Sequence, residues 1–314
     1  MQTMLTFAET DFSVLRRRVA ACERVGISAV GVGDSPKNID AFVALAAIAE
    51  HTSSVRIGPV VTNLVTRPAA AVARAISSID RLAGGGRAFL GLGAGDSALL
   101  GTGSRPKGVE GFRQGIRDVR DSWSDASHQN GRIVVAANGP LTLRMAMAEA
   151  DVVISGTGVD DASVNAVMDI ARDVERTTGR VAEIWILARV SILENKEQAL
   201  EELRPLMAAD ANHLFASKHE RSRLDPTIGR AIDTLRARYD YSAHGQRYDN
   251  PNSSLIDELG LREFLAARLA IAGPGPDVAS RFSQLSDLGI SGVAIPAIGM
   301  DADRLIENVG EILK

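Results

Sequence analysis

Residues 55–98 read VRIGPVVTNLVTRPAAAVARAISSIDRLAGGGRAFLGLGAGDSA, and this stretch decides the fold class. It begins with a short apolar run, Val55–Val61, which predicts a buried strand. The amphipathic segment Pro68–Leu82 follows, and a proline near its first turn favours a helix. A second apolar run, Arg87–Leu92, predicts another strand that ends in a glycine-rich turn. A strand, a helix and a strand in this order predict a parallel sheet.

The same alternation extends from this stretch towards both ends of the chain. Six further apolar runs predict strands: Met4–Ala8, Ala29–Val32, Ile133–Ala137, Val152–Ser155, Ile184–Ile192 and Val293–Ala297. About eight strand-then-helix units predict a (β/α)8 TIM barrel, an α/β fold, in a single domain over residues 1–314. A doubly wound open sheet is the structural alternative, because it has the same alternation of strands and helices.

Residues 210–258 break this pattern after the seventh predicted strand. The segment is polar and holds His213, His219 and His244. It is too long for a plain connection, and long loops in compact domains are often functional lids. We therefore expect an irregular insertion that covers the site and selects the substrate.

Composition excludes several classes of protein. The 314 residues contain 35 Lys+Arg and 39 Asp+Glu, which gives a net charge of −4, and 45% of the residues are hydrophobic. A mildly acidic chain is a poor nucleic-acid binder, because neutralising phosphates supplies most of that affinity. Cys22 is the only cysteine, so an intrachain disulfide framework and a cysteine-based metal site are excluded. No apolar run approaches the length of a membrane span and no secretory signal pattern is present, so we expect a soluble cytoplasmic protein.

Polar side chains and glycines gather where the predicted strands end. Because the active site of a TIM barrel lies at the carboxyl ends of its strands, these residues are expected to share one mouth. Backbone amides at such turns can bind an anion without a cationic side chain. The residues concerned are Asp34, Ser35, Thr62, Asn63, Gly93, Gly95, Asp96, Ser97, Asn138, Gly139, Ser155, Gly156, Thr157 and Gly158.

Other interpretations of these motifs are weaker. Residues 93–98 fit GxGxxA, but the next predicted strand begins near Ile133, too late for the acidic residue of a dinucleotide fold. These glycines also fit a tight packing turn. Neither Ser35 nor Ser97 lies in GxSxG, so a serine hydrolase is disfavoured. The histidines lack zinc-ligand spacing, and no metal site is expected. Asp34 also fits a simple helix cap.

Three blocks of the sequence resemble the bacterial luciferase-like superfamily of FMN-dependent monooxygenases and F420-dependent oxidoreductases. The first is VRIGPVVTN with Arg67-Pro68, residues 79–87 (IDRLAGGGR) and AFLGLGAGDSA. The second is AANGPLTLRMAMAEADVVISG, residues 136–156, and the third is AIAGPGPDVASRFSQLSDLGISGVAIP, residues 270–296. The first block looks nearest to the methylenetetrahydromethanopterin reductase branch, which uses F420.

The resemblance implies a barrel that binds an isoalloxazine or deazaisoalloxazine ring across its strand ends. It also implies a non-prolyl cis peptide, which would be Val60–Val61 here. Asp34 matches a position near the polar edge of the ring, and we expect it to donate a proton or polarise that edge, with Asp96 the second catalytic candidate. The cofactor-binding positions implied are Val60, Val61, Thr62, Asn63, Gly93, Gly95, Ala136, Ala137, Asn138, Gly139, Ser155, Gly156 and Thr157.

The function implied is hydride transfer between coenzyme F420 and a small organic substrate. One departure matters: in F420-dependent sugar-phosphate dehydrogenases a proton-transferring histidine follows the aspartate, whereas this chain has Ser35. Two alternatives stay open. One is an FMNH2-dependent monooxygenase supplied by a separate reductase, and the other is a flavin-binding barrel without turnover. Relatives often form homodimers, which leaves a homodimer open as well.

Overall fold

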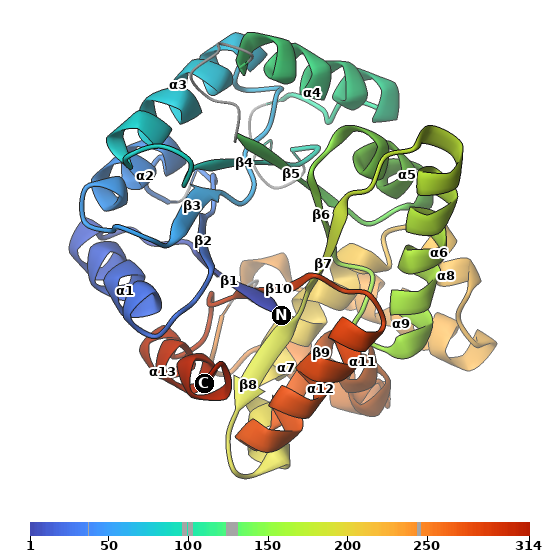
Figure 1. The fold of residues 1–314 in the computed structure, drawn as a ribbon. Helices are drawn as coiled ribbons and strands as arrows, with labels where there is room; N and C mark the ends of the chain where they lie inside the picture. The colour runs from blue at the N-terminus through green and yellow to red at the C-terminus, as the bar shows by residue number, and fades with distance from the viewer. Residues whose placement is uncertain (37, 96–98, 100–102, 124–130, 244–245) are drawn as a thin grey trace.

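The computed structural model describes residues 1–36, 38–95, 99, 103–123, 131–243 and 246–314. Its eight-stranded sheet has the order β3-β2-β1-β10-β7-β6-β5-β4, and every pairing in it is parallel. The bridges Ile57–Ala88 and Thr62–Leu92 join the edge strands β3 and β4. The sheet therefore closes into the predicted barrel (Figure 1), and the open-sheet alternative was wrong.

The barrel strands alternate with helices that surround them (Figure 1). The strands are β1 (Gln2–Phe7), β2 (Ala29–Val32), β3 (Arg56–Pro59), β4 (Phe89–Leu92), β5 (Arg132–Ala137), β6 (Val152–Ser155), β7 (Glu183–Leu187) and β10 (Gly292–Pro296). The helices are α1 (Phe12–Arg24), α2 (Ala41–Ala49), α3 (Ala69–Leu82), α4 (Val109–Trp123), α5 (Pro140–Glu149), α6 (Asp161–Thr178), α12 (Gly275–Asp287) and α13 (Ala302–Ile312).

Side-chain alternation along the strands separates two apolar cores. Residues such as Leu5, Val30 and Ile295 face outward and pack beneath the helices. Residues of the opposite faces, among them Met4 and Trp185, fill the barrel interior. Because successive side chains of a strand point to opposite faces, one short apolar run supplies both cores.

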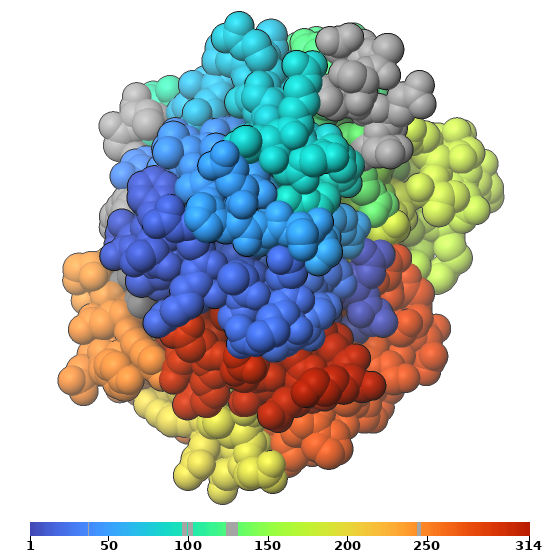
Figure 2. All heavy atoms as spheres, turned by 60° about the vertical axis from the view of Figure 1, so that its left-hand side comes forward, coloured from blue at the N-terminus to red at the C-terminus, as the bar shows by residue number. Residues whose placement is uncertain are grey.

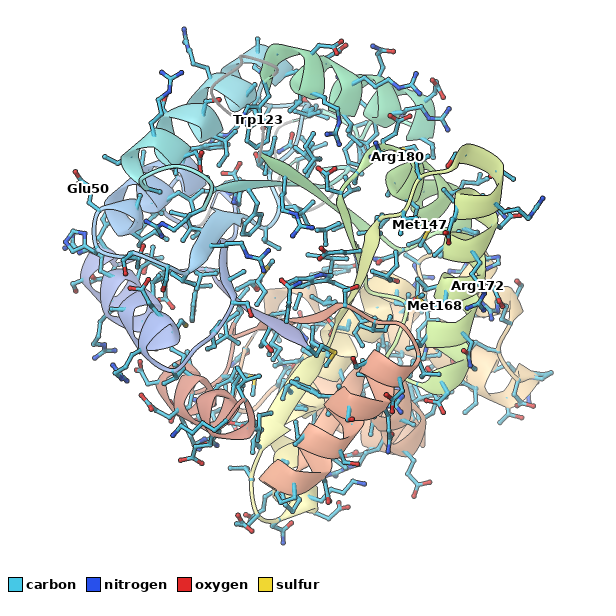
Figure 3. All side chains as sticks on the ribbon, in the orientation of Figure 1. Glu50, Trp123, Met147, Met168, Arg172 and Arg180 are labelled. Atoms are coloured by element: carbon cyan, nitrogen blue, oxygen red, sulfur yellow. The ribbon has the colours of Figure 1, made fainter. Side chains whose placement is uncertain are left out.

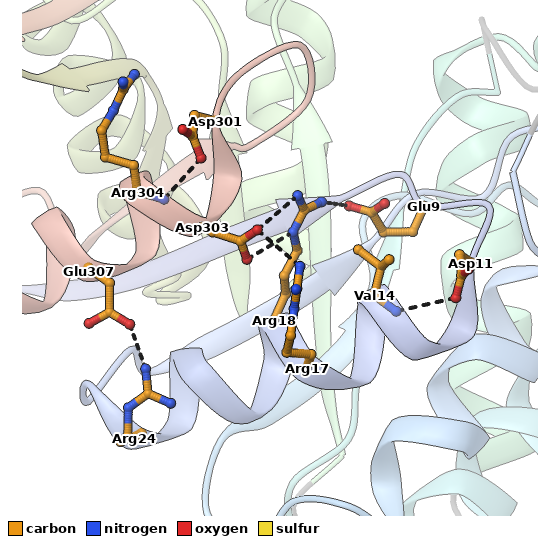
Figure 4. A network of polar contacts seen from close by, with 10 residues as sticks. All are labelled: Glu9, Asp11, Val14, Arg17, Arg18, Arg24, Asp301, Asp303, Arg304 and Glu307. Atoms are coloured by element: carbon orange, nitrogen blue, oxygen red, sulfur yellow. Dashed lines mark hydrogen bonds and ion pairs between the residues drawn. The ribbon is translucent and has the colours of Figure 1, made fainter.

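The two ends of the chain meet on one side of the barrel. Strand β1 pairs with β10, and α13 lies directly against α1 (Figure 2). Arg17 and Arg18 of α1 pair with Asp303 of α13, while Arg24 pairs with Glu307 (Figure 4). Exposed ion pairs contribute at most about 1 kcal/mol each, so the buried faces of these helices contribute most of the stability of this contact.

A polar network fills the amino end of the barrel. The Glu183 carboxylate accepts hydrogen bonds from Arg132 Nη2 at 2.5 Å, Trp185 Nε1 at 3.3 Å and Gln2 Nε2 at 3.4 Å. Burial alone would raise the pKa of Glu183, but the hydrogen bond and charge of Arg132 hold this pKa below its usual value. The Glu183 carboxylate is therefore paired within the protein at this end. Ligand chemistry in a TIM barrel takes place at the opposite end, where the strands finish.

The insertion after the seventh strand is helical, so the expectation of an irregular segment over residues 210–258 was wrong. It contains α7 (Lys196–Leu214), α8 (Lys218–Ser222), α9 (Pro226–Arg238), the 3₁₀ turn η2 (Tyr241–Ala243), α10 (Pro251–Glu258) and α11 (Arg262–Leu269). These helices lie behind the barrel in Figure 1. Their apolar faces form a core of their own around Leu206, Phe215, Leu235 and Leu265. Polar residues fill the outer faces, which explains the polar composition.

The predicted strand Ile184–Ile192 divides where the insertion begins. Strand β7 ends at Leu187, and β8 (Arg189–Ile192) leaves the barrel to pair in parallel with β9 (Ala270–Gly273). Strand β9 was not predicted, because only five residues, 270–274, separate α11 from α12 there. The β8–β9 pair carries the chain into and out of the insertion.

Candidate functional site

The predicted site residues that the structure describes lie at the carboxyl ends of five barrel strands. Asp34 and Ser35 follow β2, and residues 60–63 follow β3. Gly93 and Gly95 follow β4, Ala136–Gly139 end and follow β5, and Ser155–Thr157 end and follow β6. The second catalytic candidate, Asp96, lies outside the described residues, as do Ser97 and Ala98. The parallel barrel thus brings the described candidates to one mouth, as expected.

The Val60–Val61 peptide bond is cis, as the resemblance implied. Val60 is half-buried and packs against the interior core of the barrel. Val61, also half-buried, faces β4. The two side chains therefore give the mouth an apolar surface at the end of β3, which fits a planar ring system.

Two glycines, Gly91 in β4 and Gly93 in the turn that follows, allow β4 to lie close to residues 59–61 at the end of β3. A Cβ atom at Gly91 would lie 2.1 Å from the Pro59 carbonyl oxygen, and one at Gly93 would lie 2.5 Å from Val61 Cγ2. Real Cβ atoms do not come so near, so any side chain there would displace the cis segment. These contacts give Gly93 a packing role, whereas its predicted contact with a cofactor stays a prediction.

Asp34 lies at the centre of a network of polar contacts. Its Oδ2 atom accepts a hydrogen bond from Thr62 Oγ1 at 2.6 Å and another from Arg67 Nε at 3.1 Å. Its Oδ1 atom accepts from Arg67 Nη2 at 3.3 Å. Both oxygens are therefore acceptors in this structure, which fits a role in orienting a donor better than a role as proton donor.

Arg67 joins this network to the start of α2. Its Nη2 atom also donates to Asp40 Oδ2 at 2.5 Å, and its guanidinium lies 4.9 Å from the centre of the Phe42 ring. Burial would raise the pKa of Asp40, but the hydrogen bond and charge of Arg67 lower it. Asp40, rather than Asp34, caps α2, since it accepts hydrogen bonds from the Phe42 and Val43 amides. The interpretation of Asp34 as a helix cap was therefore wrong.

Asn63 fixes the chain that follows the cis bond. Its Oδ1 atom accepts hydrogen bonds from the Val65 and Thr66 amides at 3.0 and 2.9 Å. Its Nδ2 atom is buried, and within the described residues it has no hydrogen-bond partner. A buried donor without a partner needs an explanation in a folded protein, and a ligand acceptor is one.

On the far side of the mouth, side chains hold the turn after β6. Asn138 Oδ1 accepts a hydrogen bond from the Gly156 amide at 2.8 Å. The Ser155 and Thr157 hydroxyls are buried and lie 2.9 Å apart. These contacts order two of the segments that the resemblance assigns to the ribityl chain and phosphate.

Sequence reasoning did not identify Arg67 and Asp40 as members of the site. Arg67 appeared in the quoted RP motif, in the loop between β3 and α3, and that motif was the available signal. Its partners lie 27 and 33 residues away in sequence, so no local pattern indicates the pairing.

A separate cavity of about 840 Å³ lies at the amino end of the strands. Figure 3 shows Met147, Met168, Arg172 and Arg180 gathered along the α5–α6 side, and all four line this cavity. Its described lining contains none of the predicted site residues. The strand-end mouth therefore remains the candidate site.

Comparison with known proteins places the chain in a family. A model of the luciferase-like monooxygenase family matches residues 2–126 and 112–292. The chain belongs to this family. It is an enzyme, an F420- or flavin-dependent oxidoreductase of the luciferase-like superfamily. Within the described residues, no helix has the length and apolar character that crossing a membrane requires.

Three known proteins that are similar to this chain show which activities occur among its relatives. It is 26% identical, over 92% of both chains, to the 5,10-methylenetetrahydromethanopterin reductase of Methanolobus tindarius. It is 26% identical to the F420-dependent glucose-6-phosphate dehydrogenase of Amycolatopsis mediterranei, over 84% of this chain and 90% of the relative. The coenzyme F420-dependent tetrahydromethanopterin reductase of Methanopyrus kandleri superposes with a TM-score of 0.77 at 18% identity, over 99% and 97% of the two chains.

Proposed function

We propose that this protein transfers a hydride between coenzyme F420 and a small organic substrate at the mouth of the barrel. The observation that carries the proposal is the apolar Val60–Val61 surface with the Asp34 carboxylate held on the neighbouring strand end. The F420-dependent glucose-6-phosphate dehydrogenase, which is 26% identical over 84% of this chain, supports this cofactor over FMN.

The residues at the mouth fit a planar cofactor with polar edges. Val60 and Val61 would support one face of the ring system, and Asn63 Nδ2 is a buried donor that lacks an acceptor within the described residues. The turns at Asn138–Gly139 and Ser155–Thr157 would hold the ribityl chain and phosphate. When bound, F420 supplies the two-electron chemistry, and the protein supplies orientation and excludes water.

Asp34 would act as a fixed acceptor in this site. Thr62 and Arg67 hold its carboxylate in place, so it can orient an N–H or O–H group of the cofactor or substrate without rearranging. We retain Asp96 as the second catalytic candidate. Because Ser35 stands where the sugar-phosphate dehydrogenases have their histidine, we propose a substrate other than a sugar phosphate. The helices of the insertion would serve as the lid.

An FMNH2-dependent monooxygenase is the second candidate, and the description of the matching family favours it. Such an enzyme would need a separate reductase as a partner. Fluorescence titration of the purified protein with F420 and with FMN distinguishes the two. We expect saturable F420 binding, and tight FMN binding without F420 binding would refute the proposal.

A Thr62→Val variant adds a test of the site itself. It removes the hydroxyl that donates to Asp34 and nearly preserves the volume of the side chain. We expect turnover to fall while F420 binding changes little, because the variant alters the position of the carboxylate and leaves the apolar surface intact.

A further inference from the structure

Helix α8 of the insertion and the residue that caps its end place two basic side chains beside the turn after β6. His219 and Arg223 are exposed, and neither side chain has a hydrogen-bond or ion-pair partner among residues 1–36, 38–95, 99, 103–123, 131–243 and 246–314. Both line a small pocket whose other walls include Asn138, Thr157 and Ser163. Helices α6 and α8 lie close together in Figure 1. The pocket thus connects the insertion with the segments proposed to hold the cofactor's ribityl chain and phosphate.

Arg268 of α11 also lines this pocket and contacts both α8 and the start of α6. It donates to Glu220 Oε2 of α8 at 2.8 Å and lies 3.5 Å from the N-cap residue of α6, Asp160. A Cβ atom at Gly158 would lie 2.7 Å from Arg268 Nε, so the guanidinium packs directly on the turn after β6. Arg268 Nε is itself buried and without a partner in the described part of the chain.

Free hydrogen-bond donors, rather than net charge, favour an oxyanion at the pocket. Asp160 and Glu220 both pair with Arg268, and with Arg223 included the four charges sum to zero. The two acidic groups are therefore engaged by Arg268, whereas the side chains of His219 and Arg223 have no described acceptor and can donate to an oxyanion at the pocket.

The size of the pocket limits what it can hold. It is open to solvent on one side, and its volume is about 20 Å³. This is enough for roughly one water-sized group, which is the size of a single oxygen atom of a phosphate or carboxylate. The pocket is therefore a contact point at the edge of a larger ligand and not a second substrate site.

We propose that His219 and Arg223 bind an oxyanion in the tail of the cofactor, beyond its ring and ribityl chain. This inference rests on the proposed function and extends it, because it assigns two residues of the insertion to cofactor binding. F420 carries a phosphodiester and glutamyl carboxylates, whereas FMN ends in one phosphate. Phosphate and carboxylate groups are both oxyanions, and the length of the tail decides which of these groups reaches α8.

The test compares three ligands by fluorescence titration at low ionic strength. They are F420 with its glutamyl tail, the deazaflavin that lacks both phosphate and tail, and FMN. We expect Arg223→Gln to weaken F420 binding about two- to fivefold and the His219→Gln, Arg223→Gln double variant about tenfold, which is the scale of exposed charge pairs. Binding of the tailless deazaflavin should not change. Added salt should reduce the difference, because exposed charges are screened.

Arg176→Gln is the matched control. It makes the same charge change in the last turn of α6, about 9 Å along the helix from Ile170, the last residue of α6 that lines the pocket, at a rise of 1.5 Å per residue. Arg176 pairs with Asp173 and does not line the pocket. F420 binding by this variant should equal that of the wild type.

Each outcome has a separate meaning. Loss of F420 binding with FMN and tailless binding unchanged supports recognition of the glutamyl carboxylates, and an equal loss for F420 and FMN supports recognition of the phosphate. Equal loss for all three ligands, or no loss for F420, overturns the inference. If the wild-type protein does not bind F420, the proposed function fails before any variant is compared.

Discussion

Replacing Arg67 by glutamine tests the network around Asp34 most directly. The side chain of Asp34 is only 12% exposed, and Arg67 donates two of the three hydrogen bonds that it accepts. Arg67→Gln would leave a mostly buried carboxylate with Thr62 alone. The variant also removes the hydrogen bond to Asp40, whose side chain is 43% exposed.

The two pairs should differ in strength. Hydrogen bonds to charged groups contribute roughly 1.5–3 kcal/mol when buried, while exposed ion pairs contribute about 0.2–1 kcal/mol. Because Arg67 is 32% exposed, we expect a coupling energy of about 1–2 kcal/mol with Asp34 and less than about 1 kcal/mol with Asp40. Arg67→Gln should therefore lower the free energy of unfolding by roughly 2–3 kcal/mol.

Urea denaturation of two double-mutant cycles measures these terms. One cycle combines Arg67→Gln with Asp34→Asn, and the other combines it with Asp40→Asn. Arg67→Lys is the control, because it keeps the charge and loses the planar fork that reaches both oxygens. A coupling energy with Asp34 below about 0.3 kcal/mol, or one no larger than that with Asp40, would refute the reasoning.

Three further predictions concern stability. Gly93→Ala should cost about 1–3 kcal/mol in thermal unfolding, because its Cβ atom would lie 2.5 Å from Val61 Cγ2; an unchanged melting temperature would contradict the close packing. Burial opposes ionisation of Glu23, but three backbone N–H groups before β3 lower its pKa from 4.5 to about 2. Its contribution is therefore present above pH 4.5 and lost as the pH falls towards 2, and Glu23→Gln should flatten the acid limb of a pH–stability curve. Arg189→Gln should lower the free energy of unfolding by about 2–4 kcal/mol, because it leaves the Asp210 carboxylate without its bidentate partner; a loss below 1 kcal/mol, measured in urea, would show that the pair is well solvated.

The barrel was predictable because strand runs and helical periodicity are local properties. The run Val55–Val61 identified the strand that the structure places at Arg56–Pro59. The count of about eight units favoured a closed barrel over an open sheet, and the bridges between β3 and β4 decide between them. The insertion was not predictable in the same way. Its helices share a separate core around residues such as Phe215 and Leu235, and their mostly polar outer surfaces obscured the helical period.

The site was predictable where strand ends deliver a residue and unpredictable where a distant side chain completes it. Asp34 and Thr62 follow neighbouring strands, so the parallel sheet alone brings them together. Arg67 reaches back to both Asp34 and Asp40, and only the folded chain reveals that contact. Asp80 shows the converse: it belongs to the motif that carried the resemblance, yet it accepts hydrogen bonds from the Gly86, Arg87 and Ala88 amides and so orders a turn.

The pairing of charged groups and an unpartnered amide describe the two ends of the barrel better than cavity size does. At the amino end, Glu183 accepts hydrogen bonds from Arg132, Gln2 and Trp185, so this carboxylate is paired within the chain, and a cavity of about 840 Å³ lies alongside. Thr3 Oγ1, near the start of β1, is buried there without a partner in the described residues, but a single hydroxyl does not define a ligand site. At the mouth, Asn63 Nδ2 is buried without a partner in the described residues. An unmet buried donor costs about 1–3 kcal/mol, and a ligand acceptor removes that cost. We therefore expect the cofactor at the mouth to supply the acceptor that Asn63 lacks.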